Sequence, residues 1–299
     1  EEQVAPPEVV DTILREAANF RMGPFELMDL TGLDVSGKVM ESIYQQFLHE
    51  PRFRPSSLVP PRISAGLFGR KTSQGWYSYK DGKRIDSQDA TIDYPSASGA
   101  VWIDHKATDA EALKQFVIEQ SWSLAQQPED ADLILIQPWG QDASGYCAEN
   151  HLAAHKVVAI DPLPGLDKHR TLMLTSVTTE SARNVACTLF SADGVPFSVI
   201  NDSPGFICQR VIATIVNIAA NIAQRGIASV DDLEDAVKIG LGYPSGPLHL
   251  GDSVGAANIF EILTQQQKTT GDDRYRPSLW LRRRAQLGLA LTSEEARRS

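Results

Sequence analysis

The chain has 299 residues, a net charge of −10, and 42% hydrophobic and 22% charged residues, which is typical of a soluble protein with one to three domains. The negative charge argues against nucleic acid as a partner, because phosphate contacts require a basic surface. The most apolar run, residues 211–223, is interrupted by Thr214, Asn217 and Asn221, which argues against a membrane span. Three widely spaced cysteines, an odd number, indicate reduced thiols and a cytoplasmic location.

The first 79 residues are predicted to be helical. Pro7 suits the first turn of a helix, and apolar residues recur at helical spacing after it. Asp34 is expected to cap a second helix, which carries Val39, Ile43, Tyr44 and Phe47. Residues 80–99 are rich in Asp, Ser and Lys, a composition that predicts a linker.

Residues 100–200 have a different pattern, in which short apolar runs alternate with helical stretches. The runs suit buried strands and lie at 101–103, 133–136, 157–160, 172–174 and 197–200. Helices are expected at 109–125, 147–154 and 179–190. Strands that alternate with helices predict βαβ units and a mostly parallel sheet.

Residues 201–299 are predicted to form a second helical unit. Ser229 and Pro247 are expected to begin two of its helices, and Gly226 to end an earlier one in the left-handed conformation. That earlier helix should bury a single apolar face made of Ile207, Val211, Ile215, Ile218 and Ile222.

The chain contains an internal repeat. Residues 23–29 match 246–252, and residues 52–56 match 274–278, with offsets of 223 and 222. Two matched motifs in the same order predict two copies of one helical unit. Gly23 and Gly246, each followed by proline, are expected where two helices approach closely.

Two motifs carry a resemblance to a known family. Asn-Asp-Ser-Pro-Gly-Phe-Ile at 201–207 and Gly-Tyr-Pro-Ser-Gly-Pro at 242–247 resemble the 3-hydroxyacyl-CoA dehydrogenase family, where its Rossmann domain passes into its helical domain. The resemblance is specific for 1–79 and 196–289. It implies an α/β plus all-α fold, in which two 6-phosphogluconate-dehydrogenase-like helical domains, 1–79 and 201–299, flank a degenerate Rossmann-like parallel sheet at 100–200.

The resemblance also implies a function. Family members of the long bacterial form oxidise a short-chain 3-hydroxyacyl-CoA to the 3-oxoacyl-CoA with NAD, as in β-oxidation and fatty acid metabolism. The chain begins with Glu1 and has no counterpart of the long helix of the second repeat before Ala5. We therefore expect it to be the C-terminal portion of such an enzyme, without the N-terminal NAD-binding domain and inactive as this fragment.

The α/β segment departs from the family where its chemistry would take place. No glycine-rich turn follows the first strand, so NAD is expected to bind to the parent protein and not to this chain. Val158 stands where the family has a catalytic histidine, Arg170 or Thr171 where it has a glutamate, and Gln209 where it has an asparagine. We expect no catalytic, cofactor-binding or metal-binding residue here.

The remaining candidates are contacts with substrate or partners. Residues proposed for the acyl-CoA groove are Phe25, Met28, Gln209 and Leu248, although the apolar members also suit a core. An alternative function is a non-catalytic dimerisation and substrate-groove module, in which the repeats form a pseudo-dimer within one chain; a homodimer is a further expectation.

Three weaker candidates involve other residue types. His151 and His155 have the spacing of a metal pair but lack a third ligand. Residues 282–284 are three arginines that suit a CoA phosphate or a solvated helix face, and Cys147 would need a base to act as a nucleophile.

Overall fold

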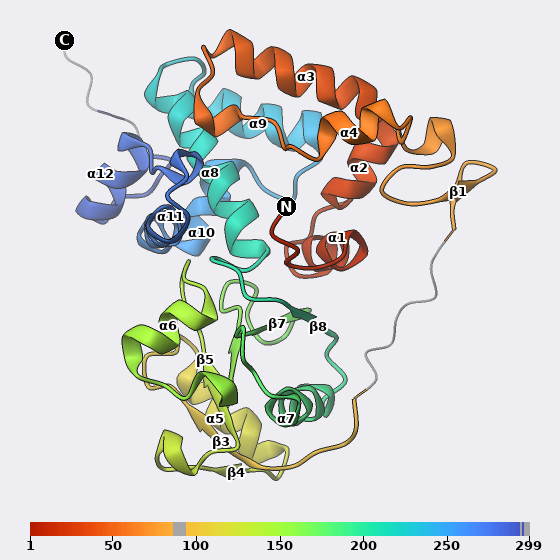
Figure 1. The fold of residues 1–299 in the computed structure, drawn as a ribbon. Helices are drawn as coiled ribbons and strands as arrows, with labels where there is room; N and C mark the ends of the chain where they lie inside the picture. The colour runs from red at the N-terminus through yellow and green to blue at the C-terminus, as the bar shows by residue number, and fades with distance from the viewer. Residues whose placement is uncertain (86–93, 294, 296–299) are drawn as a thin grey trace.

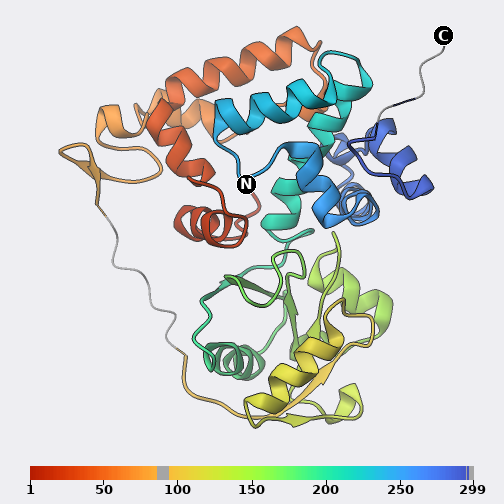
Figure 2. The ribbon, with the colours of Figure 1, turned by 180° about the vertical axis from the view of Figure 1, so that it is seen from behind.

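The computed structural model describes residues 1–85, 94–293 and 295. Helices from both ends of the chain gather in one layer, and the sheet with its own helices forms a second layer beside it (Figures 1 and 2). Among the described residues, no helix combines the length and the apolar character that crossing a membrane requires.

The amino-terminal part of the helical layer follows the sequence prediction closely. Its elements are α1 (Pro7–Glu16), α2 (Pro24–Thr31), α3 (Leu33–Gln46), η1 (Pro51–Phe53), α4 (Val59–Ser64) and η2 (Arg70–Thr72). The expected cap at Asp34 is wrong, because the N-cap of α3 is Gly32, with φ of 87°, two residues earlier. Asp34 instead lies in the first turn and pairs with Lys71.

The predicted linker begins with regular structure. Strands β1 (Tyr79–Lys80) and β2 (Lys83–Arg84) form an antiparallel hairpin with a turn at Asp81 and Gly82, both at positive φ. The linker prediction is therefore wrong for 80–84. Its residues 86–93 lie outside the described part of the chain.

The second layer is a six-stranded sheet in the order β4-β3-β5-β6-β7-β8. The strands are β3 (Ala100–Ile103), β4 (Ser123–Leu124), β5 (Leu133–Ile136), β6 (Val157–Ile160), β7 (Arg170–Leu174) and β8 (Phe197–Ile200). The five predicted strands are thereby confirmed, and β4 is an additional edge strand of two residues. The helices that belong to this layer are α5 (Ala110–Glu119), α6 (Ala143–Asn150) and α7 (Glu180–Ser191), with short turns η3 (Pro128–Asp130) and η4 (Ala154–Lys156).

One strand pair is antiparallel in an otherwise parallel sheet. β6 and β7 run in opposite directions and are joined by residues 161–169 without a helix. A parallel connection needs a crossover of a dozen or more residues, so this short loop permits only the antiparallel arrangement. The prediction of a mostly parallel sheet is thus confirmed, with this one exception.

The carboxyl-terminal helices complete the helical layer. They are α8 (Cys208–Gln224), α9 (Val230–Leu241), α10 (Pro247–Val254), α11 (Ala256–Thr270) and α12 (Leu279–Leu287), with η5 (Asp273–Tyr275) between the last two. The predicted starts of α9 and α10 are confirmed, and Gly226 follows α8 at φ of 64°.

The buried face of α8 differs from the predicted one. Val211, Ile215 and Ile218 are only half-buried, whereas Ile212 and Val216 are buried together with several small and polar side chains. The helix packs against α10, α11 and α12, so its contact surface is wider than a single isoleucine stripe. Close packing on several sides favours small residues such as Ala213 and Ala220, which the apolar periodicity does not single out.

Both copies of the repeat contain a buried carboxylate that accepts hydrogen bonds from the N-terminus of a helix. In the first copy, Asp11 on α1 accepts hydrogen bonds from the N–H groups of Phe25 (3.0 Å) and Glu26 (2.9 Å) at the start of α2. In the second copy, Glu234 on α9 accepts from the Leu248 N–H (2.7 Å) at the start of α10. A carboxylate at a helix N-terminus satisfies free N–H groups and interacts favourably with the helix dipole.

Gly23 and Gly246 leave room for these carboxylates. A Cβ on Gly23 would lie 2.2 Å from the Asp11 Cγ, and one on Gly246 would lie 1.7 Å from Glu234 Oε2 and 2.9 Å from its Cα. The expected close approach of two helices is therefore confirmed. Both glycines have negative φ, so the requirement is for space and not for an unusual backbone conformation.

We predict that Gly23→Ala and Gly246→Ala each lower the free energy of unfolding by about 1–3 kcal/mol, because the methyl group displaces the capping carboxylate. Urea unfolding measures the change. The matched control is Gly240→Ala, since nothing lies within 4 Å of a Cβ at that position of α9. The steric argument would be contradicted if Gly23→Ala and Gly246→Ala were as stable as the wild type.

The two copies also contact each other, through pairs of interactions that mirror one another. Arg52 Nη2 donates to the Arg276 carbonyl (3.0 Å), and the repeat counterpart Arg274 donates through Nη2 to the Arg54 carbonyl (2.8 Å). Ion pairs Arg54–Asp272 (2.6 Å) and Arg276–Glu50 (3.1 Å) are related in the same way. Such an exchange of equivalent contacts is the property of a two-fold interface.

Candidate functional site

The sheet and the helical layer are joined at Gln209, in the first turn of α8. Its side chain is 0% exposed. The Gly140 N–H donates to Gln209 Oε1 (2.8 Å), and Nε2 donates to Asp161 Oδ1 (2.9 Å) and to the Pro138 carbonyl (3.2 Å). One amide thus connects the loops that follow β5 and β6, at the carboxyl edge of the sheet, with α8. Ligands of open α/β sheets bind at such an edge.

Asp161 is a buried carboxyl group that is only partly satisfied. The residue is 1% exposed, and Oδ1 also accepts from the Leu163 N–H (3.0 Å), while Oδ2 has no hydrogen-bond partner among the described residues. Burial raises the pKa of the carboxyl from 3.8 to about 6, against the opposing effect of the bonds from Gln209 and Leu163. Folding therefore favours the neutral acid.

The other positions matched to family catalytic residues carry no acid–base pair. Val158 is fully buried in the centre of the sheet, paired with Leu135 and Leu174. The Arg170 guanidinium is buried and makes a bidentate pair with Asp193. A general base must hold a titratable group next to the substrate, and these side chains have structural partners instead.

The turn after β3 does not fit the pyrophosphate of a dinucleotide. Asp104 occupies it, is buried, and accepts from the Tyr146 hydroxyl (2.6 Å) and the Lys106 N–H (3.0 Å). The Asp109 carboxylate stands at the start of α5, where it accepts from Gln137 (2.9 Å). A pyrophosphate needs free N–H groups at this place, and two carboxylates there would repel it.

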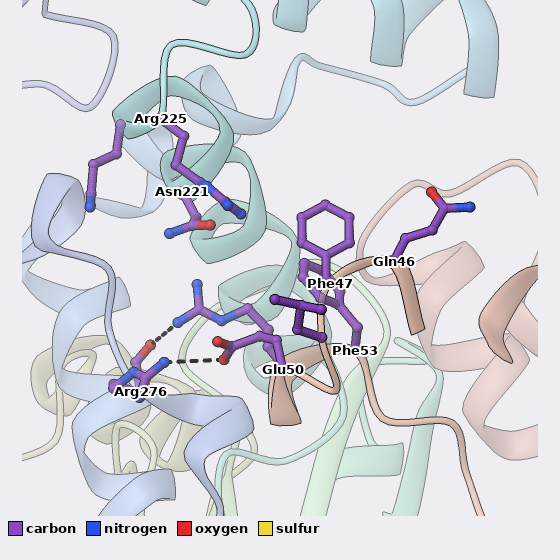
Figure 3. Close-up of a pocket in the computed structure, with 10 residues that line it drawn as sticks. Gln46, Phe47, Glu50, Phe53, Asn221, Arg225 and Arg276 are labelled. Carbon is purple, nitrogen blue, oxygen red and sulfur yellow. Dashed lines mark hydrogen bonds and ion pairs between the residues drawn. The ribbon is translucent and has the colours of Figure 1, made fainter. Parts of the chain in front are cut away.

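The four groove candidates do not come together in one cavity. Leu248 is fully buried in the core between α8, α10 and α11, and Gln209 serves the junction described above. Phe25 and Met28 are half-buried on α2, where the Phe25 ring contacts Trp76 with 4.6 Å between ring centres. None of the four lines the pocket shown in Figure 3.

That pocket lies between the two repeats and was not anticipated from the sequence. It has a volume of about 420 Å³. Figure 3 shows Asn221 and Arg225, from the end of α8, facing Phe47 of the first repeat. The lining residues are Gln46, Phe47, Leu48, Glu50, Arg52, Phe53, Asn221, Gln224, Arg225 and Arg276. The repeated Arg-x-Arg-Pro motif was the available sequence signal, because it supplies Arg52 and Arg276.

The weaker candidates have structural explanations. His151 and His155 are exposed, and no group of three metal-ligating side chains occurs in the part of the chain that the structure describes. Burial raises the pKa of the Cys147 thiol to about 12, which disfavours the nucleophilic thiolate. Arg284 is buried over the Trp280 ring at 3.3 Å, whereas Arg282 and Arg283 are exposed.

An α/β sheet joined to a duplicated helical unit defines the class of protein, and a comparison with known families identifies it. The profile described as 3-hydroxyacyl-CoA dehydrogenase, C-terminal domain, matches residues 1–79 and 205–296. The chain belongs to the 3-hydroxyacyl-CoA dehydrogenase family.

Individual relatives agree with this assignment. The chain is 32% identical over 287 residues to the 3-hydroxyadipyl-CoA dehydrogenase of Escherichia coli (strain K12), a match that covers 96% of this chain and 55% of the relative. The crystal structure of 3-hydroxybutyryl-CoA dehydrogenase from Escherichia coli K12 substr. MG1655 superposes with a TM-score of 0.76 at 31% identity, covering 96% and 56%. A probable 3-hydroxybutyryl-CoA dehydrogenase of Deinococcus radiodurans is 32% identical over 130 residues, which are 44% of this chain and 46% of that protein.

The chain spans about half the length of the curated relatives it matches. The expectation that an N-terminal NAD-binding domain is absent is not borne out by these matches, in which 96% of this chain aligns with the Escherichia coli relative.

We predict that Asp161→Asn stabilises the protein at pH 8 by about 1–3 kcal/mol, because it removes a buried charge. The folded-state pKa is raised, so the contribution of Asp161 to stability is fully present below 3.8 and lost as the pH rises through about 6. The advantage of the variant should disappear at pH 4, and urea unfolding at both pH values measures it.

Asp193→Asn is a control for which the pH dependence of stability is expected to have the opposite sign. The Arg170 guanidinium lowers the pKa of Asp193, so this carboxylate stabilises the protein above its usual pKa and loses that effect as the pH falls. If Asp161→Asn differed from the wild type in stability by the same amount at pH 4 and pH 8, ionisation of the buried Asp161 carboxyl would not be the cause of the difference.

Proposed function

We propose that this chain is the C-terminal portion of an NAD-dependent 3-hydroxyacyl-CoA dehydrogenase, which oxidises the 3-hydroxyl of a short-chain 3-hydroxyacyl-CoA to a 3-oxo group. Family membership and the names of the relatives support the reaction class. The relatives named for 3-hydroxyadipyl-CoA and 3-hydroxybutyryl-CoA favour a short acyl chain.

Within that enzyme, we assign the α/β segment 100–200 a structural role and no catalytic one. The observation that carries this assignment is the junction at Gln209, whose amide binds Gly140 and Asp161 at the edge of the sheet where substrate would bind. The carboxylates of Asp104 and Asp109 argue against NAD binding at the turn after β3.

The substrate groove is proposed to involve Phe25 and Met28, which are half-buried on α2. Burial removes the other two sequence-based candidates from direct contact with an acyl chain, because Leu248 and Gln209 are both fully enclosed by protein. Apolar side chains that remain partly accessible can bury the acyl part of a ligand at low cost.

We predict that the purified chain neither binds NAD nor reduces it with 3-hydroxybutyryl-CoA, because the residues at the family's catalytic and cofactor positions do not supply the chemistry. Calorimetric titration with NAD and the absorbance of NADH measure the two effects. The Escherichia coli 3-hydroxyadipyl-CoA dehydrogenase, assayed in the same buffer, is the matched control. Turnover by this chain that Val158 or Asp161 substitutions abolish would overturn the assignment.

A second candidate function, a dimerisation and substrate-groove module, is favoured by the mirrored contacts between the repeats. The units 1–79 and 201–299 exchange equivalent bonds, Arg52 to Arg276 and Arg274 to Arg54, as two subunits of a symmetric dimer would. Covalent linkage raises the effective concentration of the two units to roughly the millimolar range, which favours the contact within one chain.

We predict that Arg54→Asp and Asp272→Arg each weaken the contact between the repeats, and that the double variant restores it. The single ion pair is partly exposed, so the coupling free energy should be about 0.5–1 kcal/mol. A double-mutant cycle in urea unfolding measures this value. Additive effects of the two substitutions would mean that the pair does not contribute to the interface.

A further inference from the structure

The pocket between the repeats contains a buried cation, Arg52, that makes no ion pair among the described residues. Arg52 is 8% exposed, and its one hydrogen bond among the described residues goes from Nη2 to the Arg276 carbonyl (3.0 Å). Its Nε and Nη1 atoms have no partner in the described structure. Burial lowers the pKa of this guanidinium, and the nearby charge of Glu50 opposes that effect only in part. A buried cation of this kind is stabilised by a bound anion.

Most of the charged side chains that line the pocket are positive. Arg225 and Arg276 also line the pocket, and Glu50 is its single acidic residue among the described ones, so the lining carries an excess of two positive charges in a protein of net charge −10. Glu50 is already paired with Arg276 (3.1 Å). The excess therefore belongs mainly to Arg52 and Arg225, for which the described residues provide no acidic partner within ion-pair distance.

Polar and aromatic groups complete the site. Asn221 lies one turn before Arg225 on α8, and its side chain makes no hydrogen bond within the described part of the chain. Phe47 and Phe53 contact each other with 4.6 Å between ring centres, and Arg225 lies 5.4 Å from the Phe47 ring centre. The volume of about 420 Å³ lies within the range of small-molecule pockets.

We propose that this pocket binds a phosphate monoester, with Arg52 and Arg225 holding the phosphate and the two phenylalanine rings contacting the organic part. A phosphate monoester carries a charge close to −2 at neutral pH, which matches the excess of two positive charges better than a carboxylate does. The planar guanidinium groups offer paired N–H donors to phosphate oxygens. The site requires both repeats, because Arg52 comes from the first and Arg225, the C-cap residue of α8, from the second.

The binding test uses calorimetric titration of the full chain with inorganic phosphate and with phenyl phosphate at constant ionic strength. Both are expected to bind saturably at one site, since simple screening by salt does not saturate. An affinity at least tenfold higher for phenyl phosphate supports a phosphate monoester, whereas equal affinities contradict the proposed contact between the phenylalanine rings and the organic part. Absence of saturable binding by either compound overturns the proposal.

Two variants locate the site. Arg225→Gln, at an exposed position, is expected to weaken binding at least tenfold. Arg52→Met should abolish binding and still fold, because the Arg276 carbonyl keeps its second donor, Asn217 Nδ2 (2.9 Å). Unchanged affinity in Arg225→Gln and Arg52→Met would show that the anion binds elsewhere.

The matched control is Arg274→Gln. Arg274 is the repeat counterpart of Arg52 and makes the mirrored bond to the Arg54 carbonyl, but it does not line the pocket. Its substitution is expected to leave phosphate affinity within twofold of the wild type. A tenfold loss in this variant would attribute the effect to the interface as a whole and contradict the proposed site.

Discussion

The Gln209 side chain connects the sheet layer and the helical layer through buried hydrogen bonds. An amide offers both a donor and an acceptor, and Gln209 uses them on groups from the loops after β5 and β6 while standing on the first turn of α8. An apolar residue would leave the Gly140 N–H and one Asp161 oxygen without these partners in a buried place, which is costly. The same network occupies the carboxyl edge of the sheet, the place where open α/β sheets bind ligands.

Duplication explains much of the helical layer. Asp11 and Glu234 perform the same task in the two copies, receiving the N-terminus of the following helix. A second pair of repeat-related carboxylates binds backbone N–H groups outside helices, since Asp29 accepts from the Tyr77 N–H (2.9 Å) and Asp252 from the Thr292 N–H (3.2 Å). These are charged hydrogen bonds in partly buried places, where they contribute more than exposed ion pairs.

The two copies of the repeat differ in the helices that pack against them. In the second copy, α8 packs against α10 and α11 and buries Ile262. The corresponding Val39 on α3 is 52% exposed, because the described part of the first copy has no equivalent of α8. The uneven coverage also shapes the pocket between the repeats, since only one long helix contributes Asn221 and Arg225 to it.

The sequence by itself determined the local structure: the strands at 133–136 and 157–160, the helix starts at Ser229 and Pro247, and the repeat. These follow from short-range patterns of apolar residues, caps and glycines, which a single segment contains. Only the tertiary structure decided the antiparallel β6–β7 pair, the buried face of α8 and the partners of Asp161. The same holds for the pocket, whose arginines Arg52 and Arg225 lie far apart in the chain; their charges meet only because the two repeats pack together, and no local pattern encodes that contact.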